Sequence, residues 1–71
     1  MKIKKGQKLT VIDSRKGTYN GVAKEDFDTD DEWYSVAVDQ DESICGLNNE
    51  WFKGDSIPCR NGLATIKKRK E

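Results

Sequence analysis

Apolar and polar residues alternate most regularly in the middle of the chain, over residues 33–39. Tyr34, Val36 and Val38 would share one face of an extended segment there, because successive side chains of a strand point to opposite sides. Trp33 falls on the opposite face. The pattern predicts a strand with one buried face and a Trp33 ring that points away from the core.

Shorter segments predict further strands. Leu9 and Val11 are two residues apart in residues 8–13, which predicts a first strand with one buried face. We expect the other strands at residues 22–27, 44–47 and 63–67. The intervening segments are rich in glycine, asparagine and acids, which favour turns. These expected turns and breaks are residues 14–21, 28–32, 40–43, 48–50 and 61–62.

Residues 51–59 are harder to assign, because their apolar runs are short. Pro58 has no backbone N–H for a ladder, so we expect an edge strand or a short 3₁₀ turn there. Nowhere do apolar residues recur at helical spacing over a useful length. The sequence predicts no long helix.

About five short strands in 71 residues predict one small all-β domain, since a chain of this size cannot build two cores. Two small barrels compete. An oligonucleotide-binding barrel is usually longer and has a helix between strands. We therefore expect an SH3-like barrel of about five antiparallel strands spanning residues 1–71, with residues 67–71 as a flexible basic tail.

Composition leaves disorder open as an alternative, because only 34% of residues are apolar and 37% are charged. The apolar residues are mostly the β-branched and aromatic types that build sheets, which favours an ordered domain. No apolar stretch is long enough for a signal peptide or membrane span. We expect a soluble, cytoplasmic monomer with two free thiols, Cys45 and Cys59.

Catalytic chemistry finds little support in the sequence. The chain has no histidine, which removes the usual base of hydrolytic triads, and it has no phosphate-binding glycine loop before a helix. Acids at alternate positions of residues 26–32 superficially resemble a calcium loop, but its flanking helices, glycine and final glutamate are missing. We expect a non-enzymatic binding module without metal or other cofactor.

The segment from Lys5 to Ile12, followed by a loop and Asn20-Gly21-Val22-Ala23, is similar to the opening of ribosomal and transcription-elongation SH3-like barrels. Across the full chain, the runs Trp-Tyr-Ser-Val-Ala-Val and Trp-Phe-Lys-Gly resemble the small prophage-encoded YorP family. That resemblance implies an SH3-like barrel and transfers no functional residue, because the family has no established activity.

A second resemblance concerns peptide-binding SH3 domains. Trp51-Phe52-Lys53-Gly54 and Ile57-Pro58 look like two of their motifs. Pro58 follows Trp51 after seven residues, roughly half the spacing that the motifs require. This departure argues against a groove for proline-rich ligands.

The formal charges sum to zero but form three blocks along the chain. Residues 1–24 hold seven basic and one acidic side chain, residues 25–42 hold nine acidic and no basic ones, and residues 43–71 hold six basic and three acidic. Such blocks matter when the fold keeps them on separate surfaces. They supply two candidate faces.

The first candidate face joins the acidic loop to an exposed aromatic ring. An acidic loop beside an exposed ring suits a basic or extended segment of a protein partner. The alternative is that these rings are needed for the core and that the acids only aid solubility. The partner-binding candidates are Tyr19, Trp33, Asp28, Asp30 and Asp31.

The second candidate face gathers the basic chain ends, if the first and last strands are neighbours. Clustered ammonium and guanidinium groups bind phosphates and release counterions, which suits nucleic acid. Against this, a sequence pI near 6.3 is well below the usual basic footprint. The residues of this basic patch are Lys2, Lys4, Lys5, Lys67, Lys68, Arg69 and Lys70.

Overall fold

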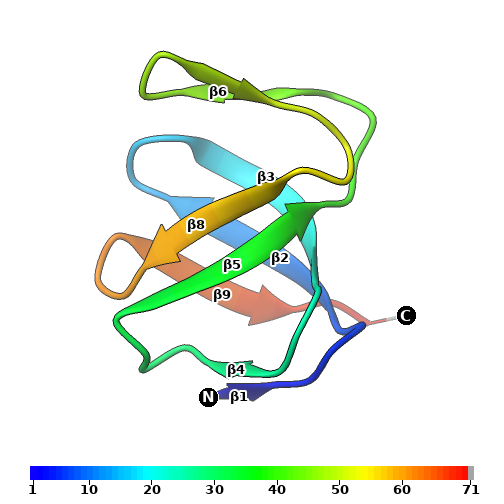
Figure 1. The fold of residues 1–71 in the computed structure, drawn as a ribbon, viewed down its shortest axis with the longest axis vertical. Helices are drawn as coiled ribbons and strands as arrows, with labels where there is room; N and C mark the ends of the chain where they lie inside the picture. The colour runs from blue at the N-terminus through cyan, green and yellow to red at the C-terminus, as the bar shows by residue number, and fades with distance from the viewer. Residues whose placement is uncertain (71) are drawn as a thin grey trace.

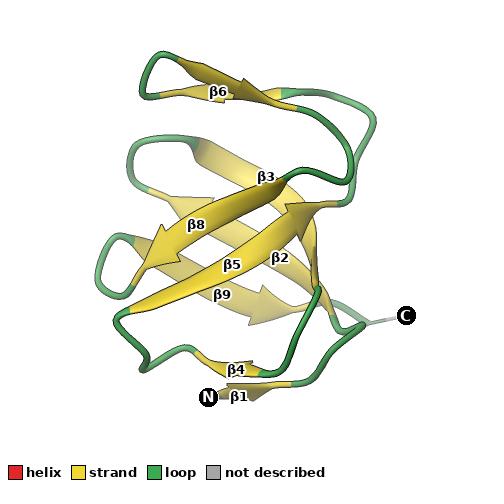
Figure 2. Cartoon of the chain, in the orientation of Figure 1, coloured by secondary structure: helices red, strands yellow, loops and turns green. Residues whose placement is uncertain are grey.

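The computed structural model describes residues 1–70, which form strands and turns without a helix (Figure 2). The strands are β1 (Lys2–Ile3), β2 (Lys8–Asp13), β3 (Gly17–Ala23), β4 (Phe27–Asp28), β5 (Trp33–Val38), β6 (Ile44–Gly46), β7 (Asn49–Trp51), β8 (Ser56–Arg60) and β9 (Ala64–Lys68). The all-β prediction is therefore confirmed. None of the helices needed to cross a bilayer is present in these residues.

Five strands form one antiparallel sheet in the order β8-β5-β3-β2-β9. The sheet is strongly curved, so that β5 and β8 lie in front of β2 and β9 in Figure 1. Within residues 1–70 no ladder joins the outer strands β8 and β9, and the sheet does not close into a barrel. Two small pairs flank it, β6–β7 at one end and β1–β4 at the other (Figure 1).

The core fills the inside of this curved sheet. Alternation places every second residue of β2, β5 and β8 inward, as predicted for residues 8–13 and 33–39. Burying these side chains supplies most of the favourable free energy of folding. The core members are Ile3, Leu9, Val11, Tyr19, Ala23, Tyr34, Val36, Val38, Ile44, Ile57, Cys59 and Ile66.

The predicted loop over residues 14–21 is wrong, because β3 already begins at Gly17. Only three residues separate β2 from β3, and Gly17 (φ +81°) takes the left-handed conformation that closes this turn. Gly21 lies within the ladder instead of in a turn, opposite Leu9 on one side and Val38 on the other. A Cβ on Gly21 would lie 2.3 Å from Cγ1 of Val36, so close packing explains this glycine.

The predicted break at residues 48–50 is also wrong. Asn49–Trp51 forms β7 and pairs with β6. Leu47 (φ 52°) and Asn48 (φ 62°) form the two-residue turn of this hairpin, where positive φ is required at both positions. The sequence signal was obscured because a leucine, which rarely adopts this conformation, occupies the first turn position.

The end of the chain is more ordered than predicted. Pro58 does lie in an outer strand, and Gly62 (φ +93°) turns the chain into β9, both as expected. The predicted flexible tail is wrong for residues 67–69, since β9 extends to Lys68 and Arg69 is anchored by side-chain contacts. The last residue of that predicted tail, Glu71, lies outside the described residues.

The Arg69 guanidinium ties together β2, β3 and Asp39, the residue that follows β5. Nε donates to the carbonyl of Leu9 at 2.8 Å, and Nη2 donates to the carbonyl of Gly21 at 3.0 Å and to Oδ2 of Asp39 at 2.9 Å. Lys8 also donates to Asp39 at 3.1 Å. The hydrogen bond from Arg69, followed by that from Lys8, lowers the pKa of the Asp39 carboxyl.

A buried ion pair lies at the turn between β2 and β3. Oδ1 of Asp13 accepts the backbone N–H groups of Arg15 (2.7 Å) and Lys16 (3.0 Å). Oδ2 receives no hydrogen bond of good geometry and faces the Lys16 Nζ at 3.1 Å. Burial raises the pKa of Asp13, but the Arg15 N–H and the contacts with Lys16 outweigh it and leave this pKa below its usual value.

The β6–β7 hairpin covers this ion pair. The Lys16 ammonium lies 5.7 Å from the ring centroid of Trp51 in β7. Gly46 of β6 packs directly on Lys16, since a Cβ there would lie 2.9 Å from its Cγ. We call Asp13, Lys16 and Trp51 the Lys16 cluster.

Both cysteines are free thiols, as expected, with Cys45 exposed and Cys59 in the core. The Cys59 Sγ lies 3.6 Å from the hydroxyl oxygen of Tyr19. Burial raises the pKa of the Cys59 thiol and of the Tyr19 hydroxyl above their usual values. These two side chains are neutral at physiological pH and belong to the core.

Candidate functional site: an acidic groove beside Trp33

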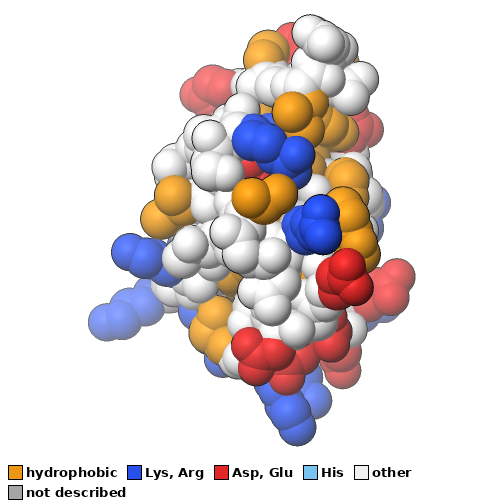
Figure 3. All heavy atoms as spheres, turned by 90° about the vertical axis from the view of Figure 1, so that its left-hand side faces the viewer, with side chains coloured by type: hydrophobic (Ala, Val, Ile, Leu, Met, Phe, Trp, Pro, Cys, Tyr) orange, Lys and Arg blue, Asp and Glu red, His pale blue; other side chains and the backbone are white. Residues whose placement is uncertain are grey.

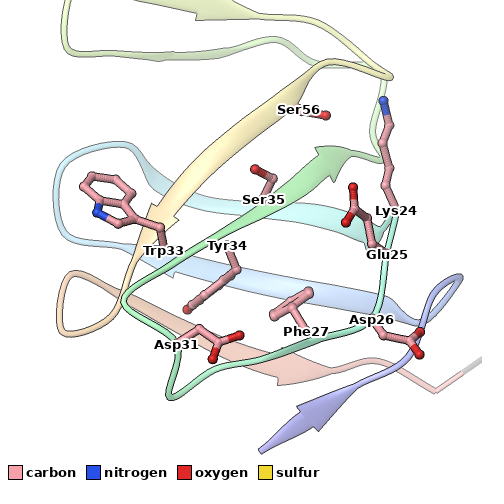
Figure 4. Close-up of a pocket in the computed structure, with 9 residues that line it drawn as sticks. All are labelled: Lys24, Glu25, Asp26, Phe27, Asp31, Trp33, Tyr34, Ser35 and Ser56. Carbon is pink, nitrogen blue, oxygen red and sulfur yellow. The ribbon is translucent and has the colours of Figure 1, made fainter.

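A groove of about 400 Å³ runs along the outside of β5. It lies between that strand and the segment that leads from β3 through β4 (Figure 4). This segment is not part of the main sheet, because β4 pairs with β1. The groove is lined by Lys24, Glu25, Asp26, Phe27, Asp31, Trp33, Tyr34, Ser35 and Ser56.

Two stacked aromatic rings form the rigid part of the groove. Phe27 and Tyr34 lie 4.6 Å apart between ring centroids and are nearly parallel, at 8°. Tyr34 is largely buried, and burial followed by the nearby Cys59 raises its pKa to about 12. The groove therefore has a preformed wall that is neutral at physiological pH.

The charged lining of the groove is mostly negative, with three carboxylates and one ammonium. The ammonium of Lys24 is turned to the carbonyl of Gly54, to which it donates at 3.0 Å. Asp26 accepts the backbone N–H of Lys5 at 2.7 Å and points away from the groove in Figure 4. Glu25 is turned inward, toward the side of Ser35 (Figure 4).

Trp33 stands at one end of the groove with 56% of its surface exposed, as the alternation of β5 predicted. Arg60 is its register partner on β8, and the Arg60 Cζ lies 5.5 Å from the centroid of the Trp33 ring. The Arg60 Nη2 also lies 3.8 Å from Oε1 of Glu32. We call Glu32, Trp33 and Arg60 the Arg60 cluster.

The acidic loop between β4 and β5 is held in a fixed shape by its own carboxylates. Oδ1 of Asp28 accepts the N–H of Asp30 at 2.9 Å, and Oδ2 of Asp31 accepts the N–H of Asp28 at 3.2 Å. The bond from Asp30, and then that from the terminal amine of Met1, lowers the pKa of Asp28. No group of carboxylates and thiols among residues 1–70 is arranged to hold a metal ion.

The structure separates the predicted partner-binding residues. Trp33 and Asp31 line the groove, while Asp28 ends β4 and Asp30 follows in the loop between β4 and β5. Acidic side chains gather in the lower part of the face shown in Figure 3, with basic side chains both above and below them. Tyr19 was wrongly included, because it lies within β3 and only 2% of its surface is exposed.

The predicted basic patch is also divided by the fold. Lys2 of β1 is the register partner of Asp28, and the Lys4 Nζ lies 3.8 Å from Oδ2 of Asp26, so both residues lie beside acidic residues. Arg69 is engaged in the strand contacts described above. The remaining basic side chains are exposed and lie in the Lys4–Gly6 turn or at the end of the chain: Lys5, Lys67, Lys68 and Lys70.

Sequence reasoning missed Glu25, Phe27 and Arg60. Glu25 and Phe27 were assigned to a strand, although the chain leaves the main sheet after Ala23. Arg60 is 27 positions from Trp33, and only the pairing of β5 with β8 brings the two together. Identification of Pro58 as an edge-strand residue was the one signal that pointed to this neighbourhood.

We compared the chain with protein-family models, with curated proteins and with solved structures, and none of the three comparisons found a match.

Proposed function

We propose that this chain is a small non-enzymatic module that binds an extended, basic segment of a partner protein along the acidic groove. The observation that carries the proposal is the exposed Trp33 ring at the end of a groove whose lining includes the carboxylates of Glu25 and Asp31. Large exposed aromatic side chains are common anchors of protein interfaces, and complementary charge steers the encounter.

The proposed fold is an SH3-like barrel, as the resemblance to the YorP family implies. The sheet order β8-β5-β3-β2-β9 supports it, since consecutive strands lie side by side from β2 through β3 and β5 to β8 and the last strand returns beside β2. The strong curvature of the sheet (Figure 1) supports it too. In this arrangement the proposed groove lies between a connecting loop and the outside of β5.

A direct test uses a synthetic peptide long enough to span the molecule. The longest dimension is 29 Å, which about nine extended residues cover at roughly 3.3 Å each. We expect a glycine-serine peptide with alternate basic residues to shift the backbone amide signals of Glu25, Trp33 and Ser35 in ¹⁵N NMR spectra. Its glutamate counterpart should leave these signals unchanged.

Trp33→Ala should weaken binding of the basic peptide at least about tenfold, because the ring is the largest exposed contact. Phe52→Ala is the matched control, since Phe52 is also 56% exposed but does not line the groove. Equal losses in the two variants would contradict the groove. Binding of a single-stranded oligonucleotide through Lys67 and Lys68, without binding of the peptide, would favour the nucleic-acid alternative.

A further inference from the structure

The Arg60 cluster already holds a guanidinium against an exposed ring and a carboxylate. The Arg60 Cζ lies 5.5 Å from the centroid of the Trp33 ring, and its Nη2 lies 3.8 Å from Glu32. All three side chains are substantially exposed: 50% for Arg60, 74% for Glu32 and 56% for Trp33. The contact of Arg60 therefore shows which group this end of the groove can hold, namely a guanidinium between an indole ring and a carboxylate.

Folding does not depend on this contact. The β5–β8 ladder is held by its backbone and, on the opposite face, by core residues such as Val36 and Ile57, which are register partners. Ion pairs between exposed side chains contribute little to the stability of a fold. Arg60 can leave the ring at little cost to the fold.

The partners of Arg60 stay in place when it leaves. The backbone N–H of Asn61 donates to the carbonyl of Glu32 at 3.0 Å, and its side-chain amide donates to the carbonyl of Asp30 at 3.2 Å. Asp31 donates its N–H to the carbonyl of Asp28 at 2.9 Å. The loop thus presents Glu32 beside Trp33 on a fixed backbone, which lowers the entropy cost of receiving a ligand.

We propose that the partner side chain received at this end of the groove is an arginine, and that Arg60 competes with it. The partner guanidinium takes the position of Arg60 over the Trp33 ring and beside Glu32. This inference rests on the proposed function and adds the identity of the anchor and an internal competitor for it. Arginine suits the site better than lysine because its planar group stacks on indole and is less strongly hydrated.

The test compares two nine-residue peptides of equal charge, one with arginine and one with lysine at its basic positions. The wild-type protein should bind the arginine peptide several-fold more tightly. Arg60→Gln removes the competitor while keeping a long side chain, and it should tighten arginine binding by about fivefold. Arg60→Lys should fall between the wild type and Arg60→Gln. Lys53→Gln removes an exposed positive charge elsewhere and controls for net charge, so it should tighten binding of the basic peptide only slightly.

The outcomes separate this inference from the proposed function. Equal affinity for the two peptides, or unchanged or weaker arginine binding by Arg60→Gln, overturns the inference while the groove still binds basic segments. Failure of both peptides to shift groove signals overturns the inference and the proposed function together. The thermal unfolding midpoint of Arg60→Gln, expected to match that of the wild type, shows that the variant is folded.

Discussion

The Lys16 cluster and the Arg60 cluster contain the same chemical parts in opposite surroundings. Each places a cation within 6 Å of a tryptophan ring centroid and beside a carboxylate, with cation-to-ring distances of 5.7 and 5.5 Å. The ion pair of the Lys16 cluster spans 3.1 Å between side chains that are 2% and 1% exposed. That of the Arg60 cluster spans 3.8 Å between side chains that are 50% and 74% exposed.

This difference in burial separates a structural role for the Lys16 cluster from the binding role that we propose for the Arg60 cluster. A buried charge that loses its partner cannot regain water, so removing one member of the buried ion pair destabilises the fold strongly. An exposed cation exchanges its partner for water or for another cation at little cost. The same set of cation, tryptophan ring and carboxylate is therefore fixed in the Lys16 cluster, whereas the cation can be exchanged in the Arg60 cluster.

The largest expected effect comes from removing the buried carboxylate charge. Asp13→Asn keeps an oxygen for the two backbone N–H groups but leaves the Lys16 ammonium buried without a counter-ion. We expect a loss of about 3–5 kcal/mol in the free energy of unfolding, measured by urea titration followed by circular dichroism. Adding Lys16→Met should recover part of that loss, because no buried charge then remains.

Glu32→Gln is the matched change in the exposed cluster and should alter the free energy of unfolding by less than about 0.5 kcal/mol. A similar loss of stability in Asp13→Asn and Glu32→Gln would contradict the assigned difference between the clusters.

Acid should weaken the Lys16 cluster through the same carboxylate. The pKa of Asp13 is lower in the folded chain than the value of 3.8 expected when unfolded, so the unfolded chain binds more protons between these two values. The stability from Asp13 is thus fully present above pH 3.8 and is lost as the pH falls through the folded pKa. Asp39 contributes in the same direction.

Urea midpoints measured from neutral to strongly acid pH check this expectation. The fall in stability should be shallower in Asp13→Asn than in the wild type. Parallel curves for the two proteins would show that Asp13 does not titrate with folding.

A smaller effect is expected from the glycine that covers the Lys16 cluster. In Gly46→Ala the new methyl group would lie 2.9 Å from Cγ of Lys16 and 3.2 Å from the carbonyl oxygen of Arg15. The resulting displacement should cost about 1–3 kcal/mol, measured by the same urea titration. Cys45→Ala, at the neighbouring exposed position, is the control and should change stability by less than about 0.5 kcal/mol.

The smallest expected effect concerns salt. Raising NaCl from 0.02 to about 0.5 M should weaken peptide binding at the Arg60 cluster, because exposed charges are screened. The same increase in salt should change the contribution of the buried Lys16 cluster to the free energy of unfolding very little. Isothermal titration calorimetry of the arginine peptide, beside urea titrations at both salt concentrations, compares the two. Salt-independent peptide binding would argue against charge steering to the acidic groove.

Much of the sheet could be predicted because alternation reports one-sided burial. Residues 8–13 and 33–38 became β2 and β5 as their alternation predicted, although Ala37 is buried as well, and Pro58 marked an outer strand. Prediction failed where the role of a residue depends on a contact with a residue far away in the sequence. Gly21 looked like a turn residue but makes room for Val36, which is 15 positions away.

The candidate site was predictable in its parts and not in its assembly. The polar spacing of β5 identified an outward Trp33, and the acidic block identified the loop beside it. Tyr19 could not be excluded, since its burial depends on β3 beginning earlier than its glycines suggested. Lys2 and Lys4 were grouped with the basic residues at the end of the chain, because neither segment by itself predicts that β1 pairs with β4.

The sequence by itself determined that this is one small all-β chain with segregated charges and an inward face on each main strand, and it placed Trp33 on the face opposite Tyr34, Val36 and Val38. These features follow from residue type and period two, which act locally. Only the tertiary structure decided which cation stands over which ring, because Lys16 meets Trp51, and Arg60 meets Trp33, across long stretches of chain. The β6–β7 hairpin then buried the contact of Lys16, while the contact of Arg60 remained exposed to solvent.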